Sequence, residues 1–148
     1  MSAGRWSRRW PARARRSWRE ITAPFGDVGL PLVDPGDIAA VAAAVLRERG
    51  HGGQVYELTG PAPVSPREQA AAIGQALGEP VRFTEQDPAR TRAELTRFMP
   101  AAVADGTLAI GGTPTAAEQR VSSDVRQILG RPGATFAGWA RRNAGAFR

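Results

Sequence analysis

Residues 30–50, LPLVDPGDIAAVAAAVLRERG, decide the fold of this chain. Residues 30–33 form a short extended run, and Asp37 follows as an N-cap or first-turn acid beside the positive end of a helix dipole. Apolar residues then recur at the spacing of one helical face: Ile38, Val41, Ala42, Val45 and Leu46. Because Gly50 follows a basic last turn, the helix is expected to end there. The stretch therefore predicts a strand that leads into a helix.

Strands and helices alternate further along the chain. Residues 54–59, QVYELT, have the composition of a strand that ends at a Gly-Pro turn. Residues 65–68, SPRE, form a capping box with proline at the first helical position, so a second helix is expected to begin there. A further short strand is predicted at residues 81–84, after the glycine that ends this helix.

The last third of the chain is predicted to be helical. One helix is expected to begin at Asp87, and residues 100–120 are expected to form a short helix followed by a loop. Ser123 and Thr135 are each expected to cap one of the two final helices. The whole pattern is α/β, with too few strands for a complete doubly wound sheet.

The charge of the chain is concentrated near its start. All 20 basic residues are arginine, and the formal net charge is +6. Seven arginines lie in the first twenty residues, where Glu20 is the only acid, whereas the other 13 arginines are balanced by 13 acids. The body of the chain therefore has no electrostatic footprint for a polyanion, and nucleic acid is not an expected partner for it.

Residues 1–23 are expected to be a disordered arm rich in arginine and tryptophan, separate from a folded unit at residues 24–148. Blocks of like charge are commonly unstructured, and proline interrupts any helical pattern here. The alternative is a small binding module in which this arm holds nucleic acid or an anionic membrane surface. No apolar run is long enough for a membrane span or the core of a secretory signal, so a cytoplasmic location is expected.

Three parts of the chain together resemble the NmrA-like group of atypical short-chain dehydrogenase/reductase proteins. They are LVDPGDIA at 32–39, then YELTGP at 56–61 with GEPV at 78–81, and finally VSSDV at 121–125 with GRP at 130–132 and TFAGWA at 135–140. The order and spacing of these pieces carry the resemblance, which covers residues 24–147. The match is weakest between residues 98 and 120.

This resemblance implies the C-terminal part of a Rossmann-type fold, with few short strands, several helices and an incomplete sheet. In the family, the opening half binds NAD(P) through a Gly-rich turn whose backbone amides approach the pyrophosphate. The glycines of residues 50–53 follow a helix rather than a strand. Gly111 and Gly112 are not followed by a convincing helix, so neither run is such a turn. NAD(P) is thus the cofactor of the parent family, and no cofactor-binding residue is expected in this chain alone.

No catalytic residue is expected either. The wider superfamily uses Tyr-x-x-x-Lys, in which lysine lowers the pKa of the tyrosine for proton transfer. Tyr56 is the only tyrosine, Gly60 stands four positions later, and the chain has no lysine. Since many NmrA-like members also lack this pair, the parent protein is left as either a redox sensor or an NAD(P)H-dependent reductase.

Other chemically active residues have structural interpretations. His51, the sole histidine, lies between glycines and is expected to be a solvated turn residue without a partner. Asp34 and Asp37 are explained by capping and turn formation. The chain has no cysteine, and Glu85 and Asp87 have no histidine near them in the sequence, so no metal site is predicted.

The resemblance implies that the turn Thr59-Gly60-Pro61 and the loop that begins at Phe83 face the substrate cleft. We therefore expect the C-terminal fragment of an NmrA-like NAD(P)-binding protein that neither binds cofactor nor catalyses alone. Its expected partner is a separate nucleotide-binding half, or a second copy of itself, bound through exposed apolar surface.

Overall fold

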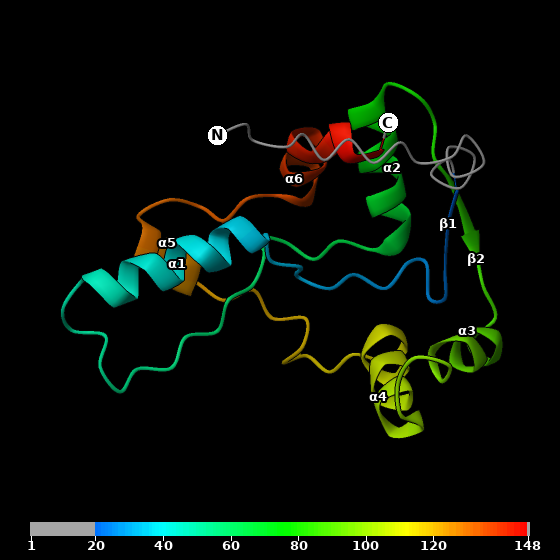
Figure 1. The fold of residues 1–148 in the computed structure, drawn as a ribbon, viewed down its shortest axis with the longest axis horizontal. Helices are drawn as coiled ribbons and strands as arrows, with labels where there is room; N and C mark the ends of the chain where they lie inside the picture. Colours follow the sequence, from blue (N-terminus) through cyan, green and yellow to red (C-terminus); the bar gives the residue numbers. More distant parts are fainter. Residues whose placement is uncertain (1–19, 148) are drawn as a thin grey trace, which may run out of the picture.

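The computed structural model describes residues 20–147. Residues 1–19, which make up most of the predicted arm, and Arg148 lie outside the described residues. The elements in chain order are β1 (Glu20–Ala23), α1 (Pro35–Arg47), α2 (Pro66–Leu77), β2 (Arg82–Glu85), α3 (Pro88–Leu95), α4 (Ala101–Gly112), α5 (Asp124–Leu129), α6 (Phe136–Asn143) and the 3-10 helix η2 (Ala144–Phe147) (Figure 1).

The described residues contain one sheet, in which β1 and β2 pair in parallel. Its register runs from Glu20 beside Arg82 to Ala23 beside Glu85. A parallel sheet of two strands cannot stand alone as a stable unit, and α2 covers this one. The predicted fold class, α/β with few short strands and an incomplete sheet, is confirmed.

Strand β1 lies inside the segment that the sequence assigned to the arm. Ile21 and Thr22 are β-branched, but four residues give too short a pattern to stand out beside the arginines that precede them. Their partner strand lies about sixty positions later in the chain, so the pairing cannot be predicted from the neighbouring sequence. The folded part of the chain therefore includes residues 20–23, and the expected boundary at residue 24 falls at the end of this strand.

The first two helices form where the sequence predicts them. The N-cap of α1 is Asp34, whose carboxylate accepts from the amide of Gly36 at 2.7 Å, and Asp37 is a first-turn acid. Helix α1 ends at Arg47, three residues before the expected stop. At α2 the predicted capping box is present, because Ser65 and Glu68 each accept from the other's backbone amide, at 3.3 and 2.8 Å.

Two predicted strands are absent from the described structure. Residues 30–33 make only an isolated antiparallel bridge, between Leu30 and Val64. Residues 54–59 are free of helix and belong to no ladder among the described residues. Both segments have suitable compositions, but a strand also needs a neighbour that completes its backbone hydrogen bonds. The third predicted strand exists as β2, shifted by one residue.

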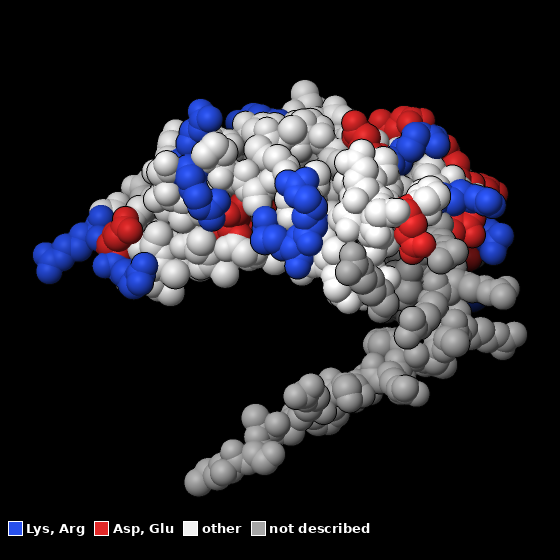
Figure 2. Space-filling model, turned by 90° about the horizontal axis from the view of Figure 1, so that it is seen from above, with Lys and Arg blue, Asp and Glu red and all other residues white. Residues whose placement is uncertain are grey.

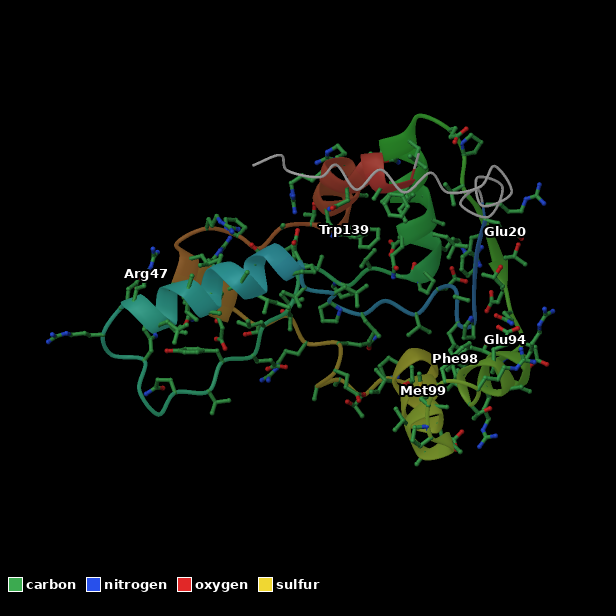
Figure 3. The ribbon with its side chains drawn as sticks, in the orientation of Figure 1. Glu20, Arg47, Glu94, Phe98, Met99 and Trp139 are labelled. Carbon is green, nitrogen blue, oxygen red and sulfur yellow. The ribbon has the colours of Figure 1, made fainter. Side chains whose placement is uncertain are left out.

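The helices after β2 follow the predictions with small shifts. Asp87 caps α3, which ends at Leu95, so Phe98 and Met99 lie in the connection to α4 rather than on a helix (Figure 3). Ser123 precedes α5 but makes no capping hydrogen bond, whereas Thr135 caps α6 by accepting from Gly138 at 3.1 Å. None of the described helices has the length and apolarity to cross a membrane.

The core is built from small side chains. The buried apolar residues are Val41, Ala44, Ala70, Ile73, Ala104, Val125 and Ala140. Helix α1 packs on α5, α2 packs on α6 and the sheet, and α3 packs on α4, which gives three adjoining clusters (Figure 1). No large side chain of the described residues is fully buried. Several large apolar side chains are exposed, Leu46, Val55 and Phe98 among them. Figure 2 shows that arginines and acids lie on the same face of the molecule, between uncharged residues.

Candidate functional site

The turn Thr59-Gly60-Pro61 lies where three distant segments cross. The amide of Gly60 donates to the carbonyl of Pro31 at 2.9 Å, and the Thr59 hydroxyl accepts from the amide of Ser122 at 2.9 Å. A Cβ added to Gly60 would collide with the carbonyl oxygen of Leu32. Glycine is needed here because the two backbones touch.

A half-open pocket of about 300 Å³ adjoins this turn. Its walls come from the predicted turn and from the segment around α5: Thr59, Gly60, Pro61, Val121, Ser122, Ser123, Val125, Arg126, Pro132 and Gly133. We call it the turn pocket. Hydroxyl groups and one arginine make it polar, although the Thr59 hydroxyl is already engaged with backbone. Three of the four predicted cleft residues thus gather around one hollow.

The fourth predicted residue, Phe83, lies elsewhere. It belongs to β2 and does not line the turn pocket. Its ring packs against Gly26, where any added Cβ would collide with it, and the guanidinium of Arg67 lies 4.8 Å from the ring centre. Phe83 therefore supports the loop after β1.

A second, mainly apolar pocket of about 340 Å³ opens at the carboxyl end of β1. It is lined by Thr22, Ala23, Pro24, Phe25, Val28, Leu30, Leu32, Val64, Pro66, Gln69, Thr91, Leu95, Thr107, Leu108 and Gly111. We call it the strand-end pocket. Ligands of α/β proteins commonly bind beyond the carboxyl ends of parallel strands, and this pocket lies in that position. Sequence reasoning missed it because β1 was not recognised.

Phe25 forms the aromatic wall of the strand-end pocket. It has φ 55°, and it begins a turn closed by the amide of Val28, which donates to the Phe25 carbonyl at 3.0 Å. Its ring lies on the end of α4, where a Cβ on Gly112 would come within 2.7 Å of it. The paired glycines rejected as a phosphate-binding turn thus leave space for this ring.

Arg67, in the first turn of α2, binds the same loop from outside the pocket. Its Nε and Nη2 donate to the two carboxylate oxygens of Asp27 at 2.8 and 3.3 Å, and its Nη2 reaches Glu85 at 3.5 Å. The hydrogen bond from Arg67 lowers the pKa of Asp27, and the same bond raises the pKa of Arg67. The carboxylate and the guanidinium are therefore both charged at neutral pH.

Two buried carboxylates attach the C-terminal segment to the start of α1. Arg142 donates to Asp34, and Arg131 donates to Asp37 at 2.7 Å. Asp37 also accepts from the amide of Ala134 at 2.6 Å. The two acids are therefore more than caps, which sequence reasoning missed because their partners lie about a hundred residues away.

His51 is not an isolated turn residue, so that prediction is wrong. Its Nδ1 lies 2.7 Å from the hydroxyl of Tyr56, and its Nε2 lies 3.8 Å from Glu48. The sole histidine and the sole tyrosine thus fasten residues 54–59 to the end of α1. In the described residues no group of three or more histidines and acids could hold a metal ion.

The chain is similar in sequence to two known reductases. No family model matches it. It is 37% identical over 133 residues to a (4-alkanoyl-5-oxo-2,5-dihydrofuran-3-yl)methyl phosphate reductase of Streptomyces griseus, which covers 89% of this chain and 47% of the relative. It is 36% identical over 138 residues to the NAD(P)H azoreductase of Xenophilus azovorans, covering 92% of this chain and 48% of that one.

A solved structure agrees with these relatives. An NADPH-dependent quinone oxidoreductase of Escherichia coli superposes with a TM-score of 0.67 at 26% identity, over 88% of this chain and 48% of that protein. The chain thus spans about half the length of each protein that it matches. Together with the residues quoted above, these similarities agree with one another: the chain resembles the C-terminal half of the NAD(P)-binding fold in the NmrA-like group of atypical short-chain dehydrogenase/reductase proteins.

Proposed function

We propose that this chain is the substrate-binding half of an NAD(P)H-dependent reductase and that it requires a nucleotide-binding half for turnover. The strand-end pocket carries this proposal, because it is an apolar hollow at the position where α/β proteins bind their ligands. The names of the relatives, an azoreductase and a quinone oxidoreductase among them, support a reductase. They also support an unsaturated electron acceptor as the substrate.

The N-termini of helices α1, α2 and α3 do not fit the phosphates of a dinucleotide. At α1, α2 and α3 a carboxylate already occupies the terminus: Asp34 accepts from Gly36, Glu68 from Ser65 and Asp87 from Ala89. These carboxylates would repel a phosphate, whereas a dinucleotide site keeps its amides free. The cofactor, which supplies hydride when bound, is therefore assigned to the other half. This chain's residues bind the substrate, orient it and exclude water.

Helix α1 supplies the surface for that other half. Residues 38–46 are nine apolar residues in succession, yet only Val41 and Ala44 of this run are buried, and Leu46 is 85% exposed. A helix that is apolar on all sides belongs inside a protein, so α1 lacks part of its cover. Residues 54–59 lie next in the chain, with strand-like composition, no ladder and Val55 95% exposed. A sheet from the nucleotide-binding half would pair with this segment and cover the helix.

Titration with NADPH tests whether cofactor binding requires the nucleotide-binding half. NADPH titrated against the purified full chain is expected to give no saturable signal. The chain is then co-expressed with the part of the Xenophilus azovorans azoreductase that it does not match, and the complex is expected to bind NADPH. Micromolar binding of NADPH by the chain alone would overturn the proposal.

Surface variants test the docking face. Leu46→Glu and Val55→Asp are expected to abolish co-purification of the two halves, since each places a charge on an apolar surface. Val103→Glu is the matched control, because Val103 is also exposed, at 53%, but belongs to α4. Equal loss with the control variant would contradict the assigned face.

A further inference from the structure

The conformation of Phe25 calls for a physical cause. It is the one non-glycine residue of the described chain with positive φ, at 55°. This left-handed region is unfavourable for a side chain with a Cβ, and aromatic residues rarely adopt it. Such a conformation persists only where surrounding contacts impose it, and it is enriched at ligand-binding sites.

The contacts that impose it meet on the next two residues. Gly26 is buried, its carbonyl accepts from the amide of Arg67 at 3.0 Å, and its amide lies 3.4 Å from a carboxylate oxygen of Glu85. The ring of Phe83 fills the space beside it. Asp27 then receives the two-pronged hydrogen bond from the Arg67 side chain.

Arg67 therefore joins every part of this support. It binds Gly26 through its backbone, binds Asp27 and Glu85 through its guanidinium, and lies 4.8 Å above the ring of Phe83. None of these contacts is inside the strand-end pocket, and Arg67 is not one of its lining residues. The Arg67 side chain therefore does not touch a ligand in this pocket, and its contacts reach the pocket through the loop that contains Phe25.

The position of Phe25 sets the shape of the pocket. Its ring lies against the glycines at the end of α4 and lines the same pocket as Leu95 and Leu108. Flat aromatic molecules stack on such a ring in offset or edge-on arrangements that add to simple apolar burial. A globular apolar molecule gains the burial and forgoes the stacking.

We propose that Arg67 is a positioning residue that fixes the Phe25 ring as the stacking wall of the strand-end pocket and so gives this pocket a preference for planar aromatic ligands. This inference rests on the proposed function, because it assumes that the strand-end pocket receives the substrate. Arg67 and Asp27 are largely exposed, at 50% and 76% of their side chains, and exposed ion pairs contribute little to stability. Loss of the ion pair between Arg67 and Asp27 should therefore change the ligand preference more than the stability of the fold.

The test uses the full chain and two alcohols of equal carbon count, planar 1-naphthol and globular 1-adamantanol. Binding is followed by NMR titration on the methyl signals of Leu95 and Leu108, which line the pocket. The unchanged chain is expected to prefer 1-naphthol by about three- to ten-fold, the range that a stacked aromatic pair contributes. Phe25→Leu, which keeps apolar volume and removes the ring, should abolish the preference.

Arg67→Met should abolish it as well, with an unchanged urea midpoint, and Arg67→Lys should restore part of it by retaining one donor. The double variant Arg67→Met/Phe25→Leu should lose no more than either single variant, since both act through one ring. Arg120→Met is the control, because Arg120 forms an exposed ion pair with Glu57 away from this pocket.

The outcomes separate the two claims. If the preference survives Arg67→Met and disappears in Phe25→Leu, Arg67 does not position the ring and the inference is overturned, while the pocket stands. If neither alcohol shifts the Leu95 and Leu108 signals of the unchanged chain, the strand-end pocket is not the substrate site and both claims fail. If Arg67→Met proves unstable, Asp27→Asn removes the same ion pair at its other partner. Retention of the ligand preference in Asp27→Asn also overturns the inference.

Discussion

Arg131 donates a hydrogen bond to Asp37 at 2.7 Å, across 94 positions of the chain. Asp37 is almost fully buried in the first turn of α1, and Arg131 lies in the segment between α5 and α6. Arg142 binds Asp34 in the same way, and Asp34 is the N-cap of α1, three positions before Asp37. The first and third parts of the resemblance to the NmrA-like group, which contain DPGD and GRP, are thus joined by one contact that attaches the C-terminal segment to the first helix.

Removing either partner of this contact should destabilise the fold. Asp37→Ala or Arg131→Met is expected to lower the free energy of unfolding by about 3 kcal/mol, the low end of the range for a broken buried ion pair, because Arg131 is half exposed. Urea denaturation measures the change. Arg120→Met breaks an exposed pair with Glu57 and should cost less than about 1 kcal/mol. Equal effects at both sites would show that burial of Asp37 contributes nothing.

The sequence predicted those features of the fold that depend on residues close together in the chain, such as helix ends. The capping box at Ser65, the proline that follows it and the closing Gly78 lie within one helix, so a pattern in the sequence suffices to find them. Residues 54–59 carry an equally clear strand pattern, but pairing depends on a neighbour that the described residues do not provide. The same dependence hid β1, whose partner is distant.

The candidate site divides in the same way. The turn at Thr59 was predicted from a resemblance in sequence, and the structure gives it a pocket of its own. The strand-end pocket depends on the left-handed conformation of Phe25 and on side chains from several separate segments. Neither can be predicted from the local sequence Pro-Phe-Gly. The sequence explained the two aspartates at the start of α1 by capping and turn formation, because nothing nearby in the sequence identified their arginine partners.

The capping box of α2 should be worth a measurable amount of stability. Ser65→Ala is expected to lower the free energy of unfolding by about 1 kcal/mol, because the Glu68 amide loses its acceptor. Ser123→Ala is the matched control: Ser123 holds the same position before α5 but makes no capping hydrogen bond. Thermal unfolding followed by circular dichroism measures both variants. A larger loss at Ser123 would contradict this account of the two caps.

Gly60 should not tolerate any side chain. Gly60→Ala is expected to cost about 1–3 kcal/mol, since the new Cβ would collide with the Leu32 carbonyl and force two backbones apart. The turn pocket should lose its shape in the same variant, which amide shifts of Ser122 would report. Gly52→Ala is the control, because nothing lies within 4 Å of a Cβ at Gly52. An unchanged midpoint for Gly60→Ala would refute the close approach.

The hairpin of α3 and α4 should weaken in acid. Arg92 donates to both carboxylate oxygens of Asp105, at 2.5 and 3.0 Å, and this hydrogen bond lowers the pKa of Asp105 below its ordinary 3.8. A carboxyl whose pKa is lowered by folding contributes stability that is present above its unfolded pKa and lost as the pH falls through the folded one. The contribution of this pair should therefore be complete at neutral pH and vanish below the ordinary aspartate range.

Asp105→Asn tests this by comparison across pH. Its melting temperature should lie below that of the unchanged chain at pH 7. The gap should shrink as the pH falls through the ordinary aspartate range and close only below the lowered pKa of Asp105, where both chains carry an uncharged group at this position. Arg92→Met should give the same pH curve, and the double variant should add nothing, because each substitution removes the same hydrogen bonds. Other acids with lowered pKa values, Asp27 and Glu118 among them, titrate equally in all of these chains and cancel in the difference. A gap that widens in acid would mean that Asp105 is stabilised in its protonated form, and the assigned ion pair would then be wrong.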